Sequence, residues 1–172
     1  YYADRIYQLP LAISGIAIGT VVLPVLSRSI ASDTNERVLF LQNRSIELSI
    51  FLSAPAAVGI IVGAEEIISC LFGYGSFNQE SIYNTSRALI IFGFGLPAFS
   101  LLKLYSNFYF ARGDTSFPFK VSVFTVAMNI LISLVFFENF GFLSIAAGTS
   151  ISCWLAVFVY KFSLKKNSLH LS

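Results

Sequence analysis

The residues that could bind an anionic group stand beside or inside apolar runs of the sequence. Asp4 and Arg5 directly precede one apolar run, and Lys103 lies within another. A guanidinium that faces a water-filled cavity can bind phosphate through two hydrogen bonds, whereas an ammonium binds it as a point charge. Each side chain could instead extend along its helix until the charge reaches the lipid head groups. The sequence leaves both interpretations open for Arg5 and for Lys103.

Uncharged polar residues inside the apolar runs define a second candidate site. Asn129 and Ser133 are four residues apart, so they share a helix face, and Thr149 lies at comparable depth in the next run. Residues of this kind commonly form hydrogen bonds between membrane helices. Their oxygen atoms could alternatively line a site for a small cation.

The sequence contains no recognisable catalytic arrangement. His170 is the single histidine and stands near the C-terminal end, so a nucleophile within the apolar runs has no histidine base. Cys70 and Cys153 are far apart in apolar surroundings, which is typical of buried or lipid-facing thiols. We therefore predict that the protein is not an enzyme and that it has no cofactor besides, at most, a small cation.

Composition places these residues in a membrane protein. Hydrophobic residues make up 56% of the 172 positions and charged residues only 12%. A soluble domain carries about a quarter of its residues as charged side chains. The net charge of +2 is small and scattered, so the sequence does not indicate a nucleic-acid partner.

The apolar runs predict an all-α integral membrane fold. A helix of about 20 apolar residues crosses the hydrocarbon core. Segments 90–102 and 142–160 are apolar or small on nearly every side, whereas helices of soluble proteins keep a polar face. We predict five transmembrane helices, at about residues 6–26, 45–62, 88–110, 121–137 and 143–160.

The charged residues between the spans predict the orientation of the chain. Basic residues gather in an amphipathic link at 27–44, a turn at 111–120 and a tail at 161–172; they are Arg28, Arg37, Arg44, Arg112, Lys120, Lys161, Lys165 and Lys166. The opposite side receives Glu65, Glu66, Glu80 and Glu138, with Arg87 as its clear cation. Lys and Arg in short loops mark the cytoplasmic face. We therefore predict that the link, the turn and the tail are cytoplasmic.

The beginning of the chain suggests a piece of a larger protein. The sequence opens at Tyr1 without an initiator methionine and lacks the pattern of a signal peptide. We expect the remainder of the same polypeptide to pack against these helices.

Several stretches carry a resemblance to a known family. They are ADRIYQLP at 3–10, GIAIGTVVLPVLSR at 15–28, LFGYGSF at 71–77, Arg87-Ala88-Leu89, and FARGDTSFP at 110–118. In order and spacing, along essentially the whole chain, they resemble MurJ, also called MviN, the bacterial lipid II flippase family of the MOP exporter superfamily.

This resemblance implies a fourteen-helix, two-lobe transporter of which the chain holds helices eight to twelve. It further implies that the full protein moves lipid II, the peptidoglycan precursor, from the inner to the outer leaflet of the bacterial cytoplasmic membrane by alternating access. Arg5 falls on one of the arginines that line the family's cavity, and Asp4 is the neighbouring acid of that motif. The implied partners are lipid II and membrane lipids.

The resemblance also bears on the polar residues of the last two spans. Some members of the family have a sodium site between helices seven, eleven and twelve, and Asn129, Ser133 and Thr149 fall near its positions. Ser133 stands where those members have a carboxylate, which argues against sodium binding here.

Two other functions remain open. Another exporter of the superfamily could move a drug or a polysaccharide-linked lipid, although the Asp4-Arg5 motif and the turn at 112–118 favour MurJ. A membrane subunit or enzyme that handles lipid-linked sugars would be expected to show acidic pairs or a histidine near the membrane surface, and the sequence offers only Glu65-Glu66.

Overall fold

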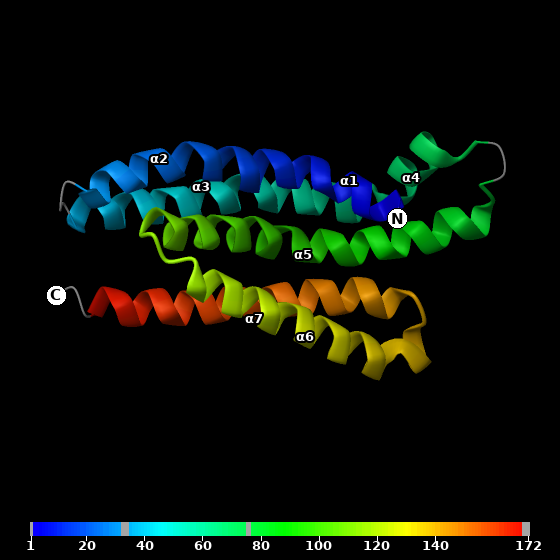
Figure 1. Ribbon diagram of the computed structural model, residues 1–172. Coiled ribbons are helices and arrows are strands. Elements are labelled where there is room, and N and C mark those ends of the chain that lie inside the picture. Colours follow the sequence, from blue (N-terminus) through cyan, green and yellow to red (C-terminus); the bar gives the residue numbers. More distant parts are fainter. Residues whose placement is uncertain (1, 32–34, 75–76, 170–172) are drawn as a thin grey trace.

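The structure is a computed structural model that describes residues 2–31, 35–74 and 77–169. Every regular element in these ranges is a helix (Figure 1). The elements are α1 (Tyr2–Leu11), a π-helical segment η1 (Ala12–Ala17), α2 (Ile18–Ala31), α3 (Asn35–Val62), α4 (Ala64–Phe72), α5 (Gln79–Ala111), α6 (Ser116–Phe140) and α7 (Leu143–Leu169).

Five stretches of helix are long and apolar enough to cross a membrane. They are Tyr2–Arg28, Glu36–Val62, Gln79–Ala111, Ser116–Glu138 and Leu143–Leu164. The first runs without interruption through α1, η1 and α2. In Figure 1 the chain of α1 and α2, α5 and α7 run in one direction, while α3 and α6 run in the other. This arrangement confirms the predicted all-α membrane fold.

The helices extend beyond the spans that hydropathy predicts. Much of the predicted link at 27–44 is helical, because α2 continues to Ala31 and α3 begins at Asn35. Likewise, α7 continues to Leu169, through most of the segment predicted as a polar tail. Hydropathy locates the part of a helix that lipid surrounds, whereas backbone hydrogen bonds extend the same helix into polar surroundings.

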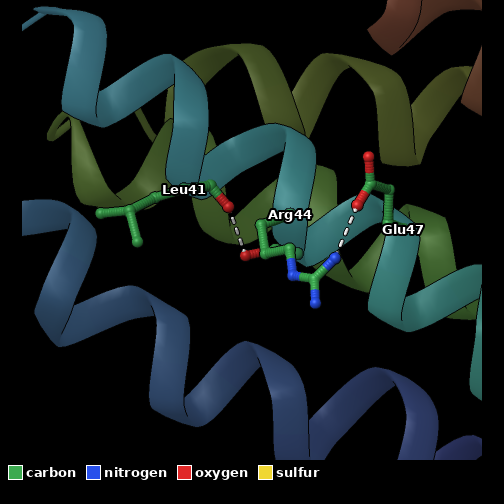
Figure 2. Close-up of polar contacts among 4 residues, drawn as sticks. Leu41, Arg44 and Glu47 are labelled. Carbon is green, nitrogen blue, oxygen red and sulfur yellow. Dashed lines mark hydrogen bonds and ion pairs between the residues drawn. The ribbon is translucent and has the colours of Figure 1, made fainter.

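The early part of α3 shows why the link is helical. Val38, Gln42, Ser45 and Ser49 are buried and recur every three or four residues, so one face of the helix packs inward from its start. On this segment the Ser45 hydroxyl donates to the Leu41 carbonyl at 2.6 Å, and Arg44 pairs with Glu47 at 3.1 Å on the exposed side (Figure 2).

Helix α5 lies at the centre of the molecule. In Figure 1, α1, α2 and α3 lie on one side of it, and α6 and α7 on the other. Leu89 and Leu96 belong to one buried cluster, together with residues of α1 and α3, and Leu104 and Phe108 belong to a second. Over half of the apolar window of α5 is buried (56%), compared with 6% for α6. Thus α5 is the scaffold of the described chain, and α6 is a peripheral helix that packs mainly on α7.

An aromatic cluster joins α5, α6 and α7 near the 111–120 turn. The rings of Tyr109 and Phe117 stack with centroids 4.6 Å apart, and Tyr160 contacts both. The Tyr109 hydroxyl donates to the Ser163 hydroxyl at 2.8 Å. Asp114 starts α6, because its Oδ1 accepts hydrogen bonds from the first backbone N–H groups of that helix. The turn is therefore fixed at both ends.

Candidate functional site

Arg5 lies in the first turns of α1, between two residues that anchor this helix. Ala3 and Ile6 are buried in the cluster that contains Leu89 and Leu96 of α5, whereas Arg5 is exposed. A charged residue flanked by buried apolar neighbours is held at a fixed place on the helix surface. Arg5 therefore projects from a helix whose position is set by packing.

Asp4 is tied to the same helix. Its Oδ2 accepts a hydrogen bond of 2.7 Å from Nε2 of Gln8, one turn later. An acidic residue in the first turn also interacts favourably with the helix dipole. Three residues after Asp4, the ring of Tyr7 lies 4.8 Å from that of Phe92 and 5.2 Å from that of Phe99, both on α5. The Asp4-Arg5 pair thus precedes a tight aromatic contact between α1 and α5.

The π-helical segment η1 brings the first span into close contact with α5. The Ser14 hydroxyl bonds the Pro10 carbonyl at 2.8 Å and the Ser100 hydroxyl at 2.7 Å, and both serines are buried. A Cβ atom on Gly15 would stand 3.2 Å from Cα of Ser100. The two backbones can therefore approach this closely only because position 15 has no side chain.

Lys103 lies at this same crossing. Its side chain is exposed, and its Cβ lies 3.7 Å from the place that a Cβ on Gly15 would occupy. Arg5 precedes Gly15 by ten residues, or on the order of 15 Å along the helix axis. The structure therefore does not bring the two cations together. It places them at different depths along the pair formed by α5 and the first span.

The three uncharged polar residues do come together, between α6 and α7. The Ser133 hydroxyl donates to Oδ1 of Asn129 at 3.1 Å, and Nδ2 of Asn129 donates to the Thr149 hydroxyl at 3.3 Å. Thr149 in turn donates to the Ile145 carbonyl at 2.8 Å. A Cβ on Gly148 would stand 2.5 Å from the Ser133 hydroxyl oxygen, so this glycine makes room for the network.

This set of atoms does not fit a cation site well. Its oxygens are all uncharged, and the Asn129 oxygen already accepts a hydrogen bond. Hard cations bind sets of oxygen ligands in which carboxylates are prominent. Over residues 2–31, 35–74 and 77–169 no three His, Cys, Asp or Glu side chains group together as metal ligands. The geometry is that of a hydrogen-bonded contact between two helices.

The contacts that position the candidate site could not be predicted from the sequence. Ser14 and Ser100 stand in apolar runs and gave no sign of pairing across 86 residues. A local signal was present in the run Pro10 to Gly15, because a proline followed by a serine four residues later commonly disturbs a helix. Such a signal indicates an irregular helix but does not identify its partner.

The sequence matches a known protein family. A family model described as lipid II flippase MurJ matches residues 1–172. The chain is 36% identical over 171 residues to a probable lipid II flippase MurJ of Rickettsia prowazekii, covering 99% of this chain and 34% of that protein. It is 41% identical over 154 residues to a probable lipid II flippase MurJ of Rhizobium meliloti, covering 90% of this chain and 29% of that protein.

A solved structure of lipid II flippase MurJ, in an inward closed conformation, is similar in fold. The TM-score is 0.87 with 29% sequence identity, and the match covers 95% of this chain and 34% of that one. The chain thus spans about a third of the length of the proteins it matches.

Proposed function

Because the chain belongs to the MurJ family of lipid II flippases, we propose that it forms one wall of the path by which lipid II crosses the membrane. It is part of a multi-pass protein of the bacterial cytoplasmic membrane. The cargo would move from the inner to the outer leaflet by alternating access of two lobes. No covalent bond is made or broken in such a step, so the proposal is transport rather than catalysis.

The chemistry of the cargo explains why a cationic wall is needed. Lipid II carries an anionic diphosphate and a sugar–peptide head group on a polyprenyl tail. An isolated charge in hydrocarbon costs several kcal/mol or more. A hydrated, positively charged cavity shields the head group, while the tail remains in the bilayer.

Arg5 is the residue on which this proposal mainly rests. It is an exposed guanidinium on a transmembrane helix that packs firmly against α5. A guanidinium binds two phosphate oxygens in a fixed geometry, which suits a diphosphate better than an ammonium does. We propose that Arg5 binds the diphosphate and that Asp4, held by Gln8, limits where the head group can sit.

Lys103 would act at another depth of the same wall. It lies beside Gly15, where the first span and α5 are in backbone contact. A head group that leaves Arg5 could therefore reach Lys103 without leaving the surface formed by the first span and α5. We propose that Lys103 contributes a second, weaker contact to the head group.

The test of this proposal compares arginine variants of the full-length protein in cells depleted of their own lipid II flippase. Arg5→Ala should abolish growth, and Arg5→Lys should restore it only in part, with membrane levels near normal in both. Arg37→Ala is the matched control, because Arg37 is exposed in the first turns of α3 and away from the proposed path. Full growth with a well-expressed Arg5→Ala protein would show that Arg5 merely anchors its helix in the head groups.

A further inference from the structure

An apolar cleft lies between α5, α6 and α7 near the turn that joins α6 to α7. Its volume is about 370 Å³, and its lining includes Ile91, Phe136, Ala147 and Ile151. In Figure 1, α6 begins close to the end of α5 and diverges from it toward this turn. The cleft occupies the space that this divergence opens. Over the described ranges, its lining contains one charged residue, Arg87.

The cleft is built on a firm contact between α5 and α7. The Ser150 hydroxyl donates to the Ile91 carbonyl at 2.9 Å, and the Trp154 indole N–H donates to the Phe94 carbonyl at 3.1 Å. These bonds fix the relative height of two helices that run in the same direction. Arg87 lies one turn before Ile91 on α5. It is therefore level with the second turn of α7, which begins at Leu143.

Arg87 places a positive charge at one end of the cleft. Its side chain is exposed, and its guanidinium carbon lies 5.5 Å from the centre of the Tyr83 ring, one turn further out. Tyrosine and arginine together are typical of the level at which a membrane helix meets the lipid head groups. The orientation predicted from the loop charges places this level at the outer face. The cleft thus combines an apolar slot with a cation at its interfacial end.

The lining of the cleft favours a phospholipid as its occupant. The α7 residues along the cleft, from Leu143 to Ile151, extend over roughly 12 Å. The volume of about 370 Å³ falls in the range of about 300–1,000 Å³ that small ligands occupy. A phospholipid places an anionic phosphate directly beside apolar chains, which matches Arg87 beside the apolar slot.

The cleft faces away from the proposed path of lipid II. Leu89 packs in the cluster that contains Ala3 and Ile6 of α1, on the Arg5 side of α5. Arg87 precedes Leu89 by two residues, or roughly 200° around the helix. A ligand in the cleft would therefore bind on the opposite side of α5 from Arg5.

We propose that this cleft binds one phospholipid with an anionic head group, with its phosphate at Arg87 and an acyl chain along Ile91, Ala147 and Ile151. Lipid tails are as apolar as the residues of the slot, so the slot alone gives little preference for one phospholipid over another. Selectivity then comes from the head group, because a guanidinium favours a lipid with net negative charge over a zwitterionic one. This site is separate from the transport path, and the proposal does not depend on lipid II movement.

The lone tryptophan of the chain provides a way to observe the site. Trp154 lies one turn after Ile151 on α7 and is partly exposed. In the full-length protein, with every other tryptophan replaced by phenylalanine, its fluorescence would be measured in vesicles containing brominated phosphatidylglycerol or brominated phosphatidylcholine. Bromine quenches indole fluorescence on contact, so quenching reports which lipid occupies the cleft.

We expect phosphatidylglycerol to bind several-fold more strongly than phosphatidylcholine next to Trp154. Arg87→Gln should reduce this ratio to about one, and Ala147→Phe should weaken quenching by both lipids because it fills the slot. Lys120→Gln is the control, because it removes an exposed cation at the other end of α6 and should leave the ratio unchanged.

Three results would overturn the proposal. Absence of quenching by either lipid would mean that another part of the full-length protein covers the cleft. Equal quenching by both lipids in the unmodified protein would mean that there is no head-group site. A preference that persists in Arg87→Gln would show that Arg87 does not make the contact. Since none of these measurements involves transport, they leave the proposed flippase function untouched.

Discussion

Polar side chains inside the spans bond mostly to the helix that carries them. The hydroxyls of Ser14, Ser45, Ser86 and Thr125 each donate to the carbonyl four residues earlier. Such bonds satisfy the hydroxyl without a partner helix and often bend the helix slightly. Side chains that bond between helices are therefore the informative ones, and Ser14–Ser100 and Asn129–Thr149 are two of these pairs.

At the residue scale, the Asn129 network allows a test of the predicted sodium site. Because its oxygens are uncharged and bonded to one another, we expect the melting temperature of the full-length protein to be the same in sodium and potassium chloride. Asn129→Ala should lower stability by about 0.6 kcal/mol in both salts, because it removes the Asn129–Thr149 bond and interhelical hydrogen bonds in membranes contribute about that much. A stabilisation specific to sodium, lost in Asn129→Ala, would restore the cation site and contradict the hydrogen-bonded contact.

At the element scale, the crossing of η1 and α5 determines where the two cations of the wall stand. The Ser14–Ser100 bond and the Gly15 contact fix the height of the first span against α5. The relative depth of Arg5 and Lys103 in the membrane therefore depends on this crossing. A larger residue at position 15 would separate the two helices without removing any charge.

Substitutions at two glycines, Gly15 and Gly59, test whether this crossing is tightly packed. Gly15→Leu should destabilise the full-length protein by about 1–3 kcal/mol, because the new side chain meets the Ser100 backbone. Gly59→Leu, also in a transmembrane helix, has nothing within 4 Å of the added Cβ and should leave stability unchanged or slightly higher. Thermal unfolding in detergent measures both. Equal effects of the two substitutions would mean that the crossing is not tightly packed.

The spans could be predicted from the sequence because hydropathy and length suffice to locate a helix in lipid. Arg5 and Lys103 could be identified as candidates because charges are rare at such positions. The position of Lys103 beside Gly15 could not be predicted, since it depends on the register between two helices distant in sequence. The π-helical segment and the helical link were also missed. Both depend on backbone hydrogen bonds, which hydropathy does not register.

At the scale of the whole molecule, orientation determines which ends of these helices meet the cytoplasm. With the 111–120 turn inside, a cysteine at Ser116 should resist an impermeant thiol reagent in intact cells, whereas one at Gln79 should react. Both positions are exposed at the start of a helix, so accessibility within the protein does not distinguish them. The reverse labelling pattern would overturn the predicted topology and with it the direction of transport along the wall.

The low burial of α6 within the described chain has a consequence for the order in which the helices assemble during synthesis. Helices α1 to α5 contact one another extensively, so they can assemble as soon as α5 has left the ribosome. Helix α6 follows next, and within the described chain its main neighbour is α7, which is synthesised after it. During that interval α6 lies in the bilayer without the helix that it mainly contacts within the described chain. Its largely apolar surface allows lipid to surround α6 until α7 has been synthesised and packs against it.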